Sequence, residues 1–159
     1  MKAIRYLHIP LSLYVGFVFV QSLFFKFTDS PETIYIFEAK LEPWGASLGF
    51  PGLFARGGIF SAHVIGSFEL IASLLILSGM LLPSRRILQA LGAVLGLGVI
   101  SGAIFFHLFT PLGIAVQNAD GSSDHGELFT LACGVWIACA ALIVLRRDEL
   151  LGLIRKKGG

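Results

Sequence analysis

Glu69 is the residue whose type and position most strongly suggest chemistry. It lies within the apolar run 66–75, and a charged side chain at the centre of a membrane costs about 2.5–3.5 kcal/mol on insertion scales. Glu69 is therefore either protonated, because desolvation disfavours its charged form, or paired with Lys26, Gln21 or a histidine. The functional interpretation is a carboxylate that handles protons or anchors a ligand. The alternative is a hydrogen bond that fixes helix packing.

Two polar residues of the first apolar stretch are candidate partners of Glu69. Lys26 can pair with Glu69 or with an anionic ligand, or its long stem can carry the ammonium group to the membrane surface. Gln21 lies five residues before Lys26, where it can meet a ligand or hydrogen-bond a neighbouring helix. We take Glu69 and Lys26 as candidate catalytic residues, and Gln21 as a candidate ligand-binding residue.

His63 and His107 are further candidates for ligand binding. They fall on successive apolar stretches near the same membrane surface. Two such histidines could hold a haem from opposite sides, bind a metal together with His125 or Glu127, or hydrogen-bond a quinone carbonyl. The alternative is that they are interfacial histidines with ordinary hydrogen bonds. No H-x-x-x-H spacing supports a metal site, so we predict none, and we favour a quinone over haem.

The elements that must position these residues are four long apolar stretches. The chain has 159 residues, of which 55% are hydrophobic and 14% charged, whereas soluble domains carry roughly a quarter charged residues. A helix needs about 20 apolar residues to cross the hydrocarbon core. We therefore predict one all-α domain over 1–159, an integral membrane four-helix bundle in contact with lipid. The predicted spans are 7–27, 58–82, 87–109 and 127–145.

The basic residues give this bundle an orientation. Threading the four spans places nine of the twelve Lys and Arg residues on one face, which is the positive-inside asymmetry of a membrane protein with both termini cytoplasmic. This placement explains the positive charge, so we expect no nucleic-acid partner. At 1.5 Å per residue, Glu69 lies roughly 16 Å and His63 roughly 8 Å below the outer surface, and the inner half is almost purely apolar. The nine residues are Lys2, Arg5, Arg85, Arg86, Arg146, Arg147, Arg155, Lys156 and Lys157.

The connecting segments carry weaker signals. In the outer link 28–57, Ser30 and Pro31 are typical of a helix start, which predicts an interfacial helix or a re-entrant loop. The segment 118–127 has alternating oxygen ligands, but a turn that caps the fourth span fits better than a calcium loop. The basic tail 146–155 could form an amphipathic helix on the inner surface. Cys133 and Cys139 are expected to be apolar filler, and pairs of small residues four apart favour tight helix packing.

Several motifs resemble those of the DoxX-like membrane proteins. They are the run 22–27 at the end of the first span, Glu42-Pro43-Trp44-Gly45, the run 66–75, and 101–108 followed by 111–114. The resemblance implies a four-helix membrane bundle. The family's lysine and second-helix glutamate match Lys26 and Glu69, and Ser22 stands where a glycine is often expected. Members of this family include a small subunit of a thiosulfate:quinone oxidoreductase, and related proteins act as assembly chaperones.

We therefore carry three functional hypotheses. The first is a small or accessory subunit of a quinone-linked or other redox complex in the bacterial inner membrane, with a polar cavity open to the outside. The second is a non-catalytic membrane assembly or interaction protein, similar to a chaperone. The third and weaker one is a small-solute or proton transporter, because no inverted repeat and no helix broken at mid-membrane is visible. We expect either a homo-oligomer or a complex with other membrane subunits.

Overall fold

The computed structural model describes residues 6–118 and 120–157 and confirms an all-helical bundle. Four helices are long and apolar enough to cross a membrane, with lengths of 20, 20, 24 and 19 residues. The described residues contain no β-strand, only an isolated bridge between Gln117 and Ser123. The four helices are α1 (His8–Phe27), α4 (Ala62–Leu81), α5 (Arg86–Phe109) and α6 (Glu127–Leu145).

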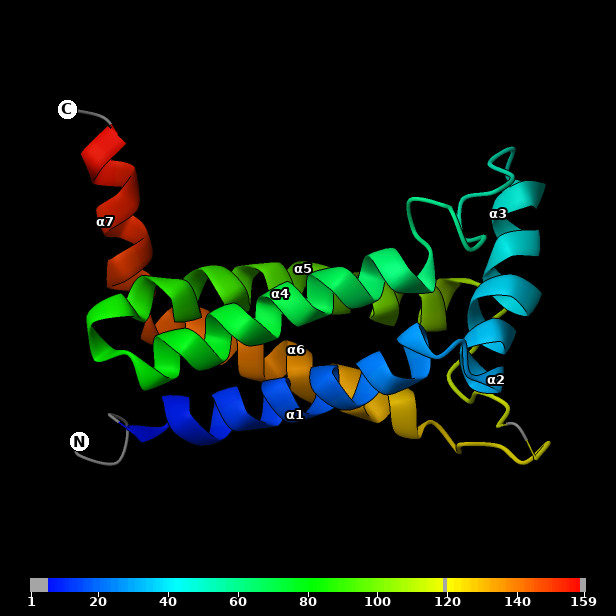
Figure 1. The fold of residues 1–159 in the computed structure, drawn as a ribbon, viewed down its shortest axis with the longest axis horizontal. Helices are drawn as coiled ribbons and strands as arrows, with labels where there is room; N and C mark the ends of the chain where they lie inside the picture. The colour runs from blue at the N-terminus through cyan, green and yellow to red at the C-terminus, as the bar shows by residue number, and fades with distance from the viewer. Residues whose placement is uncertain (1–5, 119, 158–159) are drawn as a thin grey trace.

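The four helices form a closed ring in which α1 contacts α4, α4 contacts α5, α5 contacts α6, and α6 returns to α1. They run side by side along the long axis of the molecule (Figure 1). Helix α1 begins at the same end of the bundle as α6 ends (Figure 1). That end also carries the basic turn η3 (Pro83–Arg85), so it is the end for which the charge pattern predicts the cytoplasmic side.

The core of the bundle is apolar and tightly packed. Its centre includes Phe19, Ile76 and Cys139, all essentially inaccessible to solvent. Glycine permits a close helix contact at Gly92, where an added Cβ would lie 2.8 Å from the backbone nitrogen of Ile76. The predicted small-residue packing is therefore confirmed between α4 and α5.

One predicted small-residue contact is wrong. Gly98 and Gly102, four residues apart on α5, have no atom within 4 Å of an added Cβ. Both lie on the part of α5 that faces away from its neighbours, because Gly92 and Gly96 occupy the contact face. Spacing alone does not distinguish a packed glycine pair from one on the outer surface of a bundle.

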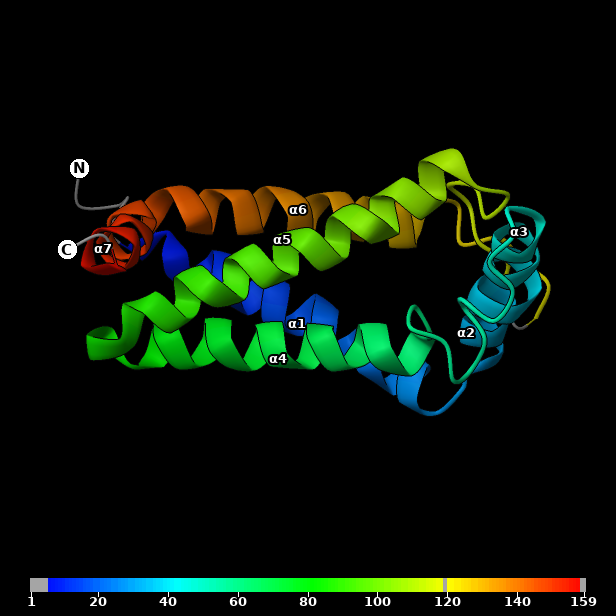
Figure 2. The ribbon, with the colours of Figure 1, turned by 90° about the horizontal axis from the view of Figure 1, so that it is seen from above.

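The first part of the outer link between α1 and α4 is helical, in agreement with the helix alternative of the prediction. Its parts are α2 (Pro31–Ile34), the π-helical turn η2 (Tyr35–Leu41) and α3 (Glu42–Ser47). Together they run across the end of the bundle (Figures 1 and 2). Ser30 caps this segment as predicted, since its Oγ accepts a hydrogen bond from the backbone N–H of Thr33.

Another helix turns away from the bundle at the opposite end. This is α7 (Arg147–Lys157), which follows α6 directly and projects sideways from the four long helices (Figure 1). Its first turn carries Asp148 and Glu149, which suits the positive end of a helix dipole. The predicted basic tail helix is therefore present, at the end that the charge pattern assigns to the cytoplasm.

Candidate functional site

Glu69 and Lys26 form an ion pair between α4 and α1. Nζ of Lys26 lies 2.9 Å from Oε2 and 3.1 Å from Oε1 of Glu69, so the ammonium group donates hydrogen bonds to both carboxylate oxygens. The side chains are 15% exposed for Lys26 and 6% for Glu69. Of the alternatives weighed for Glu69, the structure therefore shows the pair with Lys26. This pair needs no water to satisfy its charges.

Ser22 completes the cluster, and the sequence did not single out its role. Its hydroxyl donates to Oε2 of Glu69 at 2.6 Å and accepts from Nζ of Lys26 at 2.9 Å. Ser22 and Lys26 are one helical turn apart on α1, which places both side chains on the same face. We name Ser22, Lys26 and Glu69 the outer cluster.

The outer cluster lies closer to the surface than predicted. Helix α4 begins at Ala62 and not near residue 58, because Ser61 caps it by accepting a hydrogen bond from the N–H of Val64. Glu69 is then seven residues into the helix, about 10 Å from its outer end and not 16 Å. The cluster therefore occupies the outer third of the bundle, where Lys26 stands in the last turn of α1.

Gln21 is not part of the outer cluster. Its side chain is exposed on α1, and no hydrogen bond from it to another described residue is present. It lies on the lipid-facing surface, because Ser22, Leu23 and Lys26 occupy the face of α1 that packs against α4. Gln21, which was predicted to bind a ligand, therefore lies apart from the Lys26–Glu69 pair.

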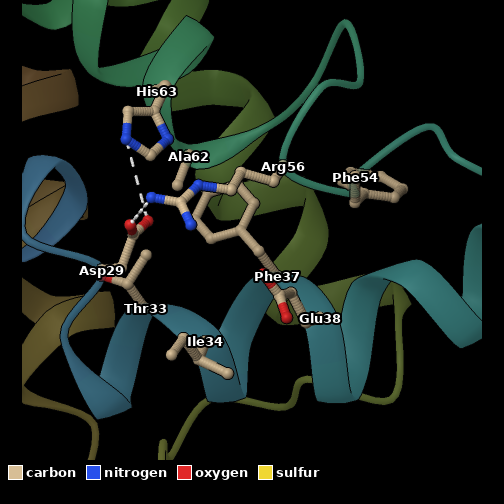
Figure 3. Close-up of a pocket in the computed structure, with 9 residues that line it drawn as sticks. All are labelled: Asp29, Thr33, Ile34, Phe37, Glu38, Phe54, Arg56, Ala62 and His63. Atoms are coloured by element: carbon tan, nitrogen blue, oxygen red, sulfur yellow. Dashed lines mark hydrogen bonds and ion pairs between the residues drawn. The ribbon is translucent and has the colours of Figure 1, made fainter.

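His63 stands above the outer cluster, in the first turn of α4. Its Nε2 lies 3.7 Å from Oδ1 of Asp29, and Arg56 donates a hydrogen bond to Oδ2 of the same carboxylate. Both side chains point toward Asp29 in Figure 3. They line a small cavity of about 10 Å³, together with Glu38 of η2 and several apolar side chains. His63 therefore lies at the outer rim of the α1–α4 seam. Because α4 begins at Ala62, His63 is only one residue inside the helix, and the predicted depth of roughly 8 Å is wrong.

His107 belongs to a different part of the outer surface. Its Nδ1 lies 2.7 Å from the carbonyl oxygen of Gly113, and its ring packs edge-on against Phe129 at 5.7 Å. His63 and His107 thus have separate partners. Among the described residues no group of three His, Cys, Asp or Glu side chains is arranged to hold a metal.

Two carboxylates organise the outer loops. Glu42 accepts hydrogen bonds from the backbone N–H groups of Gly52, Phe54 and Ala55, at 2.6, 2.9 and 3.0 Å. The bond from Gly52, followed by that from Phe54, lowers the pKa of Glu42 below its ordinary value. Glu42 therefore anchors the loop after α3 to the start of α3.

Asp124 plays the same part for the loop before α6. Desolvation acts to raise its pKa, but hydrogen bonds from the N–H groups of Gly126, Val116 and Leu128 outweigh it and hold the pKa below the ordinary value. The bond from Leu128 reaches into the first turn of α6 at 3.2 Å. The capping turn predicted for 118–127 is therefore confirmed, with Ala119 outside the described residues.

The inner half of the bundle holds a polar cluster that the sequence analysis missed. Nε2 of Gln89 donates to Oγ of Ser12 at 2.7 Å, and Oε1 of Gln89 accepts from Nε of Arg146 at 2.6 Å. Ser12 and Gln89 are fully buried. This inner cluster joins α1, α5 and the end of α6, so the prediction of an almost purely apolar inner half is wrong. The sequence feature that could have predicted this cluster is the single amide side chain of Gln89 among apolar neighbours.

Comparison with known protein families, with curated proteins and with solved structures gave no match for this chain. The resemblance to DoxX-like proteins accordingly remains an expectation that rests on the motifs.

Proposed function

We propose that this chain is a small membrane subunit of a quinone-linked redox complex, in which the outer cluster contacts the quinone head group. The observation that carries this proposal is the nearly buried Lys26–Glu69 pair in the outer third of the bundle. Ionisable residues inside a membrane are rare and are by default functional candidates. The four apolar helices suit a multi-pass protein, and we place it in the bacterial inner membrane with both termini cytoplasmic.

The two charged residues would have different roles in this proposal. Lys26 is the more accessible of the pair, at 15% against 6%, so its ammonium group meets the ligand. It exchanges one of its hydrogen bonds to Ser22 or Glu69 for one to a quinone carbonyl. Glu69 holds Lys26 in place and exchanges protons with the site. Reducing a quinone to a quinol takes two electrons and two protons, and the electrons come from a redox-active partner subunit. Exposed Phe24 and Phe25 leave an apolar approach from the lipid beside Lys26.

A second function is favoured by one specific observation. Lys26 and Ser22 already hydrogen-bond both oxygens of Glu69, so the cluster can hold α1 against α4 without any ligand. A chain with this role would be a non-catalytic assembly or interaction protein. Loss of such a protein lowers the amount of a partner complex in the membrane.

The variant Glu69→Gln separates the two functions. It keeps the size of the side chain and removes its charge, so quinone-dependent turnover of the native complex should fall at least tenfold while the partner's level stays normal. Gln21→Leu is the matched control, because it removes another polar side chain of the outer half from a lipid-facing position. Copurified quinone is measured in parallel by mass spectrometry.

Two outcomes would overturn the quinone proposal. Unchanged turnover with an unchanged free energy of unfolding would remove any role for Glu69 in the chemistry. The assembly function would instead be supported if Glu69→Gln lowers the amount of the partner complex in the membrane and no quinone copurifies with the wild-type protein.

A further inference from the structure

One carboxylate, that of Asp29, joins three segments at the outer end of the bundle. Asp29 lies in the link between α1 and α2, Arg56 in the loop before α4, and His63 in the first turn of α4. Arg56 donates to Oδ2 of Asp29, and Nε2 of His63 faces Oδ1 (Figure 3). The carboxylate therefore connects the end of α1 to the start of α4 from above.

The backbone fixes the direction of this carboxylate. Asp29 has a φ of 49°, in the left-handed region that non-glycine residues seldom adopt. The next residue, Ser30, donates its backbone N–H to the carbonyl oxygen of Phe25 at 3.0 Å, which closes the last turn of α1. Aspartate tolerates this conformation because its short polar side chain can hydrogen-bond locally. Asp29 is thus held in place at the hinge between α1 and α2.

The contact between Asp29 and His63 depends on the charge of the imidazole. At 3.7 Å it is too long for a hydrogen bond, but it is within ion-pair distance when His63 is protonated. Histidine is the side chain whose charge responds to physiological pH. The attraction between Asp29 and α4 is electrostatic, and it is strongest while His63 carries a proton.

The other charged groups around the cavity allow this response. Asp29 and Glu38 contribute two negative charges and Arg56 one positive charge, so the lining carries one net negative charge while His63 is neutral. Protonation of His63 neutralises the lining. The next cation along the seam, Lys26, is already paired with Glu69. Arg56 repels a protonated His63, but it is mostly exposed to solvent, which screens the repulsion.

The cavity stands directly above the outer cluster. The ring of His63 packs against that of Phe27, with 5.9 Å between the ring centroids. Phe27 follows Lys26 in the chain and packs against α4 at Gly66, where an added Cβ would lie 3.4 Å from the ring. Gly66 is about one turn above Glu69 on the same face of α4. The Phe27 ring therefore lies between the His63 imidazole and the part of the α1–α4 seam that holds the Lys26–Glu69 pair.

We propose that Asp29, Arg56 and His63 form an acid-responsive clamp over the outer end of the α1–α4 seam. When the outer medium is acidic, the clamp tightens and covers the outer cluster. At neutral or alkaline pH it loosens. The clamp rests on its own contacts and does not depend on the quinone proposal. If the outer cluster does bind a ligand, the clamp sets access to it from outside.

Hydrogen exchange of the full chain in lipid nanodiscs tests the clamp at pH 5.5 and pH 7.5, after correction for intrinsic exchange rates. Protection of the backbone amides in 25–34 and 52–64 should rise about threefold at pH 5.5, the size expected for one partly exposed ion pair. Ordinary carboxylates stay ionised at both values. Asp29→Asn and His63→Gln should abolish the rise. His125→Asn, which alters an exposed histidine of the other outer loop, should retain it.

His63→Lys provides a positive test, because its charge is present at both pH values. It should give high protection at pH 5.5 and at pH 7.5. Protection of the α5 and α6 amides shows whether each variant is folded. If Asp29→Asn or His63→Gln is not folded, the test of the clamp rests on His63→Lys. The clamp is wrong if the wild type shows no acid-dependent rise, if His63→Gln or Asp29→Asn retains it, or if folded His63→Lys remains pH-dependent.

Discussion

The outer and inner clusters join the same bundle at opposite ends with different chemistry. The outer cluster ties α1 to α4 through two full charges, Lys26 and Glu69, with a serine hydroxyl between them. The inner cluster ties α1 to α5 and the end of α6 through a neutral amide, Gln89, which donates to Ser12 and accepts from Arg146. Each cluster satisfies its own polar atoms, and among the described residues no buried side-chain nitrogen or oxygen lacks a partner.

This difference bears on which cluster carries function. Taking two charges out of water costs several kcal/mol per ion, and their attraction offsets this only when the geometry is good. A neutral amide avoids most of that cost while still fixing helix packing. The only charge of the inner cluster belongs to Arg146, which lies outside the spans at the end of α6. Packing alone is thus achieved more cheaply at the inner end, so the charged outer pair is the better candidate for a functional site.

The largest predicted effect comes from breaking the outer pair on one side only. Lys26→Met leaves the Glu69 carboxylate buried with Ser22 as its remaining partner, and the free energy of unfolding should fall by about 3–5 kcal/mol. The double variant Lys26→Met with Glu69→Gln removes both charges and should recover most of this loss. Reversible unfolding in mixed micelles measures both values. Equal losses in the single and double variants would show that the two charges are not coupled.

Removing the inner amide should cost less. Gln89→Leu deletes two hydrogen bonds and leaves the Ser12 hydroxyl and the Arg146 guanidinium without that partner, which predicts a loss of about 1–3 kcal/mol. Because Arg146 immediately precedes α7, the amides of α7 should also exchange faster. Gln21→Leu, the lipid-facing counterpart, should change stability by less than about 0.5 kcal/mol. A larger loss for Gln89→Leu than for Lys26→Met would reverse the ranking of the two ends.

The two ends should also differ in their response to acid. The Gly52 and Phe54 N–H groups lower the pKa of Glu42 from its ordinary 4.5, so its contribution to the outer loop is fully present above pH 4.5 and is lost as the pH falls through the lowered value. As the pH falls below 5.5, where the clamp is already closed, proteolysis within 50–60 should therefore increase only in strong acid. Glu42→Gln should be cleaved faster at every pH.

The inner cluster has no group that titrates in this acid range. Ser12 and Gln89 are neutral, and burial lowers the pKa of Arg146 without bringing it near this range. Exchange of the α5 amides next to Gln89, once corrected for intrinsic rates, should therefore stay constant while the outer loop opens. Parallel opening of both ends would mean that acid unfolds the whole bundle and does not act through Glu42.

The sequence predicted what depends on long apolar runs and on charges that interrupt them. The four spans and the importance of Glu69 follow directly from these signals. The start of α4 was misplaced because Ile59 and Phe60 continue the apolar pattern, although Ser61 is the residue that caps the helix. Gln89 was missed because an uncharged amide near the end of a span resembles an interfacial residue until its partners are known.

Partner choice was the part that the sequence could not determine. His63 and His107 lie at similar outer depth, yet one faces Asp29 and the other the Gly113 carbonyl. Which residue meets which depends on helix rotation and on the course of the outer loops. Both are set by packing over the whole bundle and not by spacing along one helix.

The smallest predicted effect compares the two serines. Ser12→Ala removes the acceptor of the Gln89 amide in a fully buried position, which should cost about 2 kcal/mol, whereas Ser22→Ala leaves Lys26 and Glu69 in direct contact and should cost about 1 kcal/mol. Unfolding in mixed micelles resolves this difference if both variants are measured together. If Ser22→Ala proves the more costly, the direct ion pair depends on the hydroxyl. The outer cluster would then act as one unit of three residues, with Ser22 as necessary as either charge.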